Sequence, residues 1–341
     1  MNRAILIAIP DAPLRAAPAG GEENIALAEH LVRSASDPEQ VLQAARIFAL
    51  EGFRDRAALV LRHGIMAHPR HPDLLAALAD LLSRTGAFEE AELAFRQALE
   101  SDPKIPETWY RRGLHYGRQG RTAEAAAAYE EVVRLRVDHV KGWVNLGLSR
   151  SDMGEREAAV RALERAIQVE PGCRDAHVNL GVLYAEGGQR EEALEQFRRA
   201  VAIDPGCSEA HFNLGWALLE ENELDRAEGT LLESVRIDPG NVECLYALAL
   251  LHQRTGNYAR AVVVLKQAIE RRPDDARLHY YLGVAYNSQE AVDQAILALE
   301  TAARLRPDDP RVHRLLGVAY DKKELPARAR EAYREAAALS G

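Results

Sequence analysis

The histidines are the residues of this chain whose spacing first suggests chemistry. Four of them have sequence numbers that differ by 34 or a multiple of it: His177, His211, His279 and His313. Imidazole is the commonest metal ligand in proteins, so the row could form a ladder of metal sites. Zinc, however, holds nitrogen ligands at about 2.1 Å, so its ligands must converge on one ion. Single histidines separated by so long an interval cannot converge. We therefore expect no metal site and no cofactor.

The three cysteines do not predict a disulfide. Cys173 and Cys207 are separated by the same interval as His177 and His211, and Cys244 follows later in the chain. Equivalent positions on neighbouring packed helices are about 8–10 Å apart, whereas the Cα atoms of a disulfide lie within about 7 Å. The odd number of cysteines points the same way. We expect reduced cysteines and a cytoplasmic protein.

No other pattern in the chain is typical of an enzyme. There is no glycine-rich phosphate loop, no nucleophile elbow and no pair of catalytic carboxylates in a suitable context. The 341 residues carry a formal net charge of −9 without a basic stripe, which argues against nucleic-acid binding. No apolar run approaches the length of a membrane span, and the one before Pro10 is short for a secretory signal. We expect no catalytic residues.

The interval shared by the histidines runs through almost the whole sequence. A helix-stopping position recurs at this spacing, at Pro69, Pro103, Val137, Pro171, Pro205, Pro239, Pro273 and Pro307. If the proline is position 32 of a repeat, the first repeat spans 38–71 and the ninth spans 310–341. Such a period is typical of a solenoid of helical hairpins, in which each repeat buries its apolar face against its neighbours.

Each repeat contains two helices with apolar faces. The first, helix A, has apolar or small residues at positions 4, 7, 8 and 11, which form one face of an α-helix. The second, helix B, has alanine, an aromatic or leucine, and alanine at positions 20, 24 and 27. In one repeat these residues are His177, Leu180, Gly181 and Tyr184, then Ala193, Phe197 and Ala200. At these positions about nine-tenths of the chain resembles the tetratricopeptide repeat (TPR) family. The resemblance implies an all-α, right-handed superhelical solenoid of antiparallel helix pairs, with about eight or nine repeats.

The repeats divide the chain into three parts. Residues 1–37 are expected to form a leader with a short helix, residues 38–105 two divergent repeats, and residues 106–341 seven regular ones. Arg46 and Asp80 mark the divergence on two A helices. Position 15, between the helices, is mostly glycine or asparagine, which tolerate the left-handed backbone that ends a helix. Glu290 and Glu324 occupy it in the last two repeats. Each is expected to cost about 1 kcal/mol relative to glycine.

The resemblance also implies a partner-binding groove, because TPR proteins turn helix A positions 2, 5, 9, 12 and 13 toward their ligands. Position 9 is apolar in seven consecutive repeats: Leu114, Leu148, Val182, Trp216, Leu250, Val284 and Val318. Position 5 adds Tyr110, Val144, Val178, Phe212, Tyr246 and Tyr280. Packing between helices explains the residues at position 5 equally well. It explains position 9 poorly, because that position usually faces solvent in TPR proteins and is commonly polar. A long apolar strip on a concave wall is typical of a partner site, with Trp216 as its anchor.

Charges divide this expected groove. Its middle repeats are acidic, with Asp152, Asp175, Glu186, Glu209, Glu220 and Glu243, and its last two are basic, with Arg277, Arg311, Arg314 and Lys322. Acidic residues near a helix start are favoured by the helix dipole, so they carry little information. Arg277 and Arg311 oppose that dipole. We expect them to receive an acidic stretch or a terminal carboxylate. The lysine and asparagine of carboxylate-clamp TPRs are absent at positions 5 and 9.

Asparagine recurs at position 6 in three consecutive repeats. The residues are Asn145, Asn179 and Asn213. Similar asparagine ladders line the superhelix of O-linked N-acetylglucosamine transferases, where they hold an extended peptide. The alternative is that these side chains form hydrogen bonds within the solenoid. Nothing resembling the catalytic half of that family is present.

Two classes of function follow. The first is a non-catalytic scaffold or adaptor that binds a peptide or helix of a partner protein in its groove. The second is an assembly factor or structural subunit of a larger complex, such as a bacterial-type secretion, pilus or envelope machinery. A specificity module of an enzyme acting in trans is a further alternative. All three need protein or peptide partners.

Overall fold

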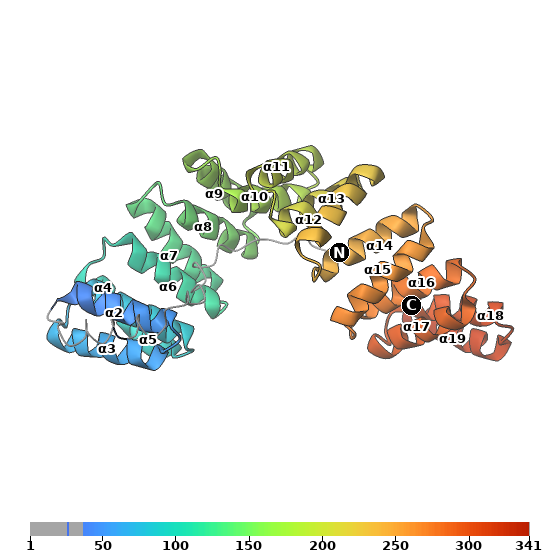
Figure 1. The fold of residues 1–341 in the computed structure, drawn as a ribbon, viewed down its shortest axis with the longest axis horizontal. Coiled ribbons are helices and arrows are strands. Elements are labelled where there is room, and N and C mark those ends of the chain that lie inside the picture. The colour runs from blue at the N-terminus through green and yellow to red at the C-terminus, as the bar shows by residue number, and fades with distance from the viewer. Residues whose placement is uncertain (1–25, 27–36, 341) are drawn as a thin grey trace. The chain divides into compact units, whose positions relative to one another are not determined.

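The periodic sequence predicts pairs of helices, and the computed structural model is built from them (Figure 1). It describes residue 26 and residues 37–340, and this part of the chain contains helices and no β-strand. The all-α solenoid of antiparallel helix pairs is therefore confirmed. Two units are distinguished by their internal contacts, with the division between Leu183 and Tyr184. We call residues 37–183 the N-terminal unit and residues 184–340 the C-terminal unit.

A helices carry even numbers and B helices odd numbers. The N-terminal unit contains α2 (Pro38–Leu50), α3 (Arg54–Ala67), α4 (Pro72–Arg84), α5 (Phe88–Ser101), α6 (Pro106–Arg118), α7 (Thr122–Leu135), α8 (Val140–Asp152) and α9 (Arg156–Val169). Helix α10 (Arg174–Glu186) contains the division. The C-terminal unit continues with α11 (Arg190–Ile203), α12 (Ser208–Glu220), α13 (Leu224–Ile237), α14 (Val242–Arg254), α15 (Tyr258–Arg271), α16 (Ala276–Ser288), α17 (Val292–Leu305), α18 (Pro310–Lys322) and α19 (Pro326–Ser340).

Glycine at position 8 sets the distance between the two helices of a repeat. A β-carbon on Gly113 in α6 would lie 2.5 Å from the ring of Tyr129 in α7. One on Gly283 in α16 would lie 2.5 Å from the side chain of Leu299 in α17. Both separations are closer than packed carbon atoms tolerate, since protein interiors have almost no free space. The missing side chain therefore allows the large residue of helix B to fill the pair's core.

The turn between the helices has the left-handed backbone expected at position 15. Gly256, for example, has φ 73°. Asn222, Glu290 and Glu324 have φ 59°, 59° and 60° at the same position. The two glutamates thus keep the glycine geometry, in the region where a β-carbon is expected to be strained.

Several A helices begin with a side-chain cap. Asp37 and Asp309 accept hydrogen bonds from the backbone N–H groups of Glu39 and Arg311, so both residues are N-caps. Three further A helices have a cap of the same kind. Asp275 accepts from the N–H of Arg277, Asn241 from Cys244, and the ring nitrogen Nδ1 of His139 from Gly142. All five residues occupy the position just before helix A, so the cap is a feature of the repeat.

The periodic histidines occupy the repeat position that Trp109 and Trp143 occupy in two other repeats, and both residue types make the same hydrogen bond. Nε1 of Trp109 and of Trp143 donates to the carbonyl oxygens of Pro103 and Val137, at 2.9 and 2.8 Å. Nε2 of the four histidines lies 2.7–3.1 Å from the corresponding proline carbonyl, at His177, His211, His279 and His313. A carbonyl accepts, so the proton is on Nε2. These rings join helix A to position 32 of the preceding repeat, just after its helix B.

Other residues of chemical interest are placed as follows. Cys173, Cys207 and Cys244 are buried, and none of them forms a disulfide within the described part of the chain. Among the described residues no group of three or more histidine, cysteine or acidic side chains is arranged to hold a metal ion. Residues 26 and 37–340 include no helix that is both long and apolar enough to cross a membrane. The short helix expected before residue 37 lies outside the described range, apart from residue 26.

Candidate functional site

Position 9 of the A helices forms an apolar row on the C-terminal unit. Trp216, Leu250, Val284 and Val318 lie on α12, α14, α16 and α18, and all four are partly exposed. Trp216 and Leu250 pack against a core cluster that includes Leu245 and Leu282. Because the core supports these side chains without covering them, their remaining surface is available to a partner. We call these four residues the apolar row.

The same position is less uniform in the N-terminal unit. Leu114 on α6 and Leu148 on α8 are partly exposed, as on the other unit. Val182, on α10, is 0% exposed. The side chain of Val182 therefore presents no surface to a ligand, and the predicted strip is interrupted at that residue.

Position 5 belongs mostly to the protein interior. The buried members are Tyr110, Val144, Val178, Phe212 and Tyr246, and only Tyr280 is partly exposed. Packing was the alternative explanation for this position, and burial favours it. Phe212 contacts Trp216, with 6.3 Å between the ring centroids. The buried Phe212 therefore packs against the partly exposed Trp216 from the protein interior.

The asparagines of position 6 are buried as well. Asn145 is 5% exposed, and its Nδ2 donates to the hydroxyl of Tyr110 at 3.1 Å. Asn179 and Asn213 are even less exposed. Side chains in this environment cannot hold the backbone of a ligand. The alternative of hydrogen bonding within the solenoid accounts for Asn145, and burial removes all three from an accessible groove.

The positive charge of Arg277 is balanced by two carboxylates of the protein itself. Its guanidinium lies 2.7 Å from a carboxylate oxygen of Asp275 and 3.0 Å from one of Glu243. It also lies over the ring of Tyr246, 5.3 Å from the centroid. The hydrogen bond to Asp275 raises the pKa of Arg277. With two carboxylates already bound, this arginine is poorly suited to receive an acidic ligand.

Arg311 repeats the arrangement with a more open geometry. It pairs with Asp309 at 2.7 Å and lies 5.4 Å from the ring centroid of Tyr280. This hydrogen bond lowers the pKa of Asp309. The side chain of Arg311 is nevertheless 60% exposed, and Arg314 on the same helix is exposed too. These two residues remain candidates for contact with a partner.

Basic residues at position 13 tie successive repeats together. Arg254 donates to the carbonyl of Leu219 at 2.7 Å, and Lys322 donates to that of Asn287 at 3.0 Å. Both carbonyls lie at the end of the preceding A helix, where the helix dipole favours a positive charge. Lys322 thus has a structural explanation that the sequence did not supply.

An aromatic cluster borders the apolar row. Tyr281 on α16 contacts Tyr246 at 5.2 Å and Tyr280 at 5.1 Å between ring centroids, both edge-on. Burial raises the pKa of Tyr246, and the neighbouring hydroxyl of Tyr281 adds to this effect. Tyr281 is partly exposed and was not among the predicted residues. The signal for it was a tyrosine at position 6, where three other repeats have asparagine.

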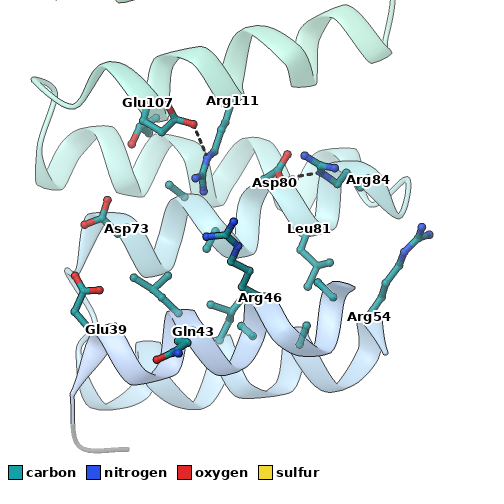
Figure 2. Close-up of a pocket in the computed structure, with 18 of the residues that line it drawn as sticks. Glu39, Gln43, Arg46, Arg54, Asp73, Asp80, Leu81, Arg84, Glu107 and Arg111 are labelled. Atoms are coloured by element: carbon teal, nitrogen blue, oxygen red, sulfur yellow. Dashed lines mark hydrogen bonds and ion pairs between the residues drawn. The ribbon is translucent and has the colours of Figure 1, made fainter. Parts of the chain in front are cut away.

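A cavity of about 1230 Å³ lies elsewhere, in the N-terminal unit (Figure 2). Its walls come mainly from α2, α4 and α6, and they include Arg46, Asp80, Arg84 and Arg111. No residue of the predicted groove lines it. The signal was nevertheless visible, because Arg46 and Asp80 occupy position 9, which is apolar in the seven later repeats. The two charged residues therefore indicate that the A-helix surface is polar in the first two repeats and apolar in the later ones.

Family models match most of the described chain. The tetratricopeptide repeat model matches residues 42–106, 76–139 and 110–150. The model of the cilia and flagella-associated protein 70 C-terminal domain matches residues 136–341, more than half of the sequence. No curated protein matches this chain.

Solved structures show the same fold. The Cut9–Hcn1 hetero-tetramer of APC/C is similar with a TM-score of 0.55 and 19% identity, over 94% of this chain and 64% of that chain. A tetratricopeptide repeat protein from Parabacteroides merdae has a TM-score of 0.53 and 18% identity, over 69% of this chain and 93% of that one. At these identities the likeness concerns the fold alone. Together with the family models, it shows that the chain belongs to the tetratricopeptide repeat family, with residues 136–341 in the family of the cilia and flagella-associated protein 70 C-terminal domain.

Proposed function

We propose that this protein is a non-catalytic scaffold or adaptor that binds a peptide or helix of a partner on the A-helix face of its C-terminal unit. The observation that carries the proposal is the apolar row. Four consecutive A helices present partly exposed Trp216, Leu250, Val284 and Val318 at one repeat position. Exposed apolar surface that recurs in register is typical of an interaction site.

The chemistry around the row defines the partner segment. Trp216 is the largest side chain of the row, and the partly exposed Tyr280 and Tyr281 lie on the same unit. Aromatic residues supported by a core are the usual anchors of protein interfaces. The exposed Arg311 and Arg314 would meet acidic residues at the end of the segment. The partner is therefore a protein segment that is apolar over most of its length and acidic at one end.

The test is binding of a captured partner to two matched variants. Trp216→Ala removes the anchor of the row, whereas Leu232→Ala truncates a side chain that is 50% exposed on α13. Loss of a buried interface tryptophan costs about 2 kcal/mol or more, which weakens binding at least about 30-fold. We expect this loss for Trp216→Ala and no loss for Leu232→Ala, with both proteins folded by circular dichroism. Normal binding by Trp216→Ala would reject the proposed surface.

A second candidate is a subunit of a larger assembly, held by its outer surface. It is favoured by exposed apolar residues on B helices, at the same repeat position in pairs of adjacent repeats: Leu59 and Leu93, and Val263 and Leu297. The family that matches residues 136–341 is named after a protein associated with cilia and flagella. In this case Leu297→Ala would disrupt a stoichiometric complex and Trp216→Ala would not.

We further infer a cytoplasmic location. Three buried cysteines without a disulfide suit a reducing compartment. Fractionation of cells that express the full chain tests this inference. Recovery of the protein with a secreted or envelope fraction would contradict it.

A further inference from the structure

The cavity of the N-terminal unit has a separation of charge along its length. Five acidic and five basic side chains line it. Glu39 and Asp73 lie toward one end, Arg84 and Arg54 lie toward the other, and Arg46 projects between them (Figure 2). A ligand that fits this trough therefore needs both signs of charge.

Some of these charges are already paired within the protein. Asp80 lies 2.8 Å from Arg84 and 3.5 Å from Arg118, and Glu107 lies 3.4 Å from Arg111. The pair of Asp80 with Arg118 joins α4 to α6, and the other two pairs lie within one helix. All of these side chains have little charge left for a ligand.

Three other charged side chains of the cavity form no ion pair with any residue in the described part of the chain: Arg46, Glu39 and Asp73. All three are exposed. The helix dipole explains the two acids, which lie in the first turns of α2 and α4. It does not explain Arg46, which lies mid-helix at the position that is apolar in the later repeats.

Two uncharged residues of the wall have a buried polar atom without a hydrogen-bond partner among the described residues. Thr108 on α6 is 1% exposed, and its Oγ1 has none. The same holds for Oε1 of Gln40 on α2. Both residues line the cavity. An unsatisfied buried polar atom destabilises a protein, because it has lost its hydrogen bonds to water. Such atoms therefore favour a ligand that brings hydrogen-bonding groups of its own.

We propose that this cavity is a second binding site, which takes an extended peptide segment with a block of basic residues next to a block of acidic ones. The acidic side chains meet Arg46, and the basic ones meet Glu39 and Asp73. The peptide backbone supplies hydrogen bonds to the polar wall. A phosphate or another small anion fits less well, because the acids of the trough repel it. The site differs from the apolar row in its residues, its unit and its ligand chemistry.

The probes are fluorescein-labelled synthetic peptides of equal length. One carries a lysine block followed by a glutamate block, a second alternates the same residues, and a third contains lysine without glutamate. We expect the full-length protein to prefer the block peptide over the alternating one by fluorescence anisotropy. The preference should shrink between about 0.1 M and about 1 M salt, where the screening length falls from about 10 Å to about 3 Å.

Variants decide where the peptide binds. Arg46→Glu should weaken the block peptide by at least about tenfold, equivalent to about 1.4 kcal/mol. The same variant should bind the lysine peptide more tightly than the unaltered protein does, a gain that misfolding cannot produce. Arg96→Glu on α5 and Trp216→Ala should leave both affinities unchanged. Equal binding of the block and alternating peptides, or full binding by Arg46→Glu, would overturn the proposal. Loss with Trp216→Ala would place the peptide on the apolar row instead.

Discussion

Glycine in place of Glu290 should stabilise the turn between α16 and α17. Glu290 has φ 59°, in the left-handed region. A residue with a β-carbon pays about 1–2 kcal/mol there. Glycine removes this strain, but it gains about 0.5–1 kcal/mol of freedom in the unfolded chain. The difference predicts a net stabilisation of about 0.5–1 kcal/mol. Gln289→Gly is the matched control, because that residue has φ −89° and carries no strain of this kind.

Native-state amide hydrogen exchange in α16 and α17 is the appropriate assay. Solenoid stability is close to a sum of local repeat terms, so a global melting curve would dilute the effect. Exchange should slow for Glu290→Gly and accelerate for Gln289→Gly, whose only change is added freedom in the unfolded chain. If both variants accelerated exchange to a similar degree, the left-handed turn would not be strained and the reasoning would be wrong.

Three further predictions concern the repeat itself. In urea unfolding, Gly283→Ala should lower the free energy of unfolding by about 1–3 kcal/mol, because the new β-carbon would lie 2.5 Å from the side chain of a core leucine. Gly117→Ala, with no other atom within 4 Å of the new β-carbon, should instead raise it by up to about 1 kcal/mol, because alanine favours the helix. Burial lowers the pKa of His139, so its stabilisation is complete above the unfolded pKa of about 6.5 and is lost as pH falls below that value toward the folded pKa. His139→Asn should keep the cap, as Asn241 does in another repeat, and reduce this acid sensitivity by about 1 kcal/mol; an unchanged pH profile of unfolding would argue against the cap.

The regular part of the fold could be predicted because the same residue types recur at the same positions in many repeats. Proline at position 32, glycine at positions 8 and 15, and tryptophan, histidine or an aliphatic residue at position 4 recur in register. Even Glu290, an exception to the pattern, has the backbone that the pattern requires. Three caps at position 34 escaped prediction because His139, Asn241 and Asp275 share a function without sharing a residue type.

The candidate site was predicted less well, for a physical reason. Periodicity places a side chain on a face of a helix, but burial depends on the neighbouring helices. Val144 and Leu148 lie one helical turn apart on α8, yet the first is 0% exposed and the second is partly exposed. Arg277 shows the same limit for charge, since Glu243 comes from a different repeat. Contacts between repeats decide which surface is left for a partner.

Site-specific photo-crosslinking would show whether the apolar row or the outer surface of the B helices contacts another protein. Val284 lies in the apolar row on α16, whereas Val263 on α15 is 56% exposed on a B helix. A photoreactive phenylalanine derivative at either position, in the full chain expressed in cells, reports which surface meets another protein. We expect a discrete crosslinked partner from position 284 that is lost on adding Trp216→Ala. Crosslinks from position 263 alone would contradict it and assign the interaction to the outer surface.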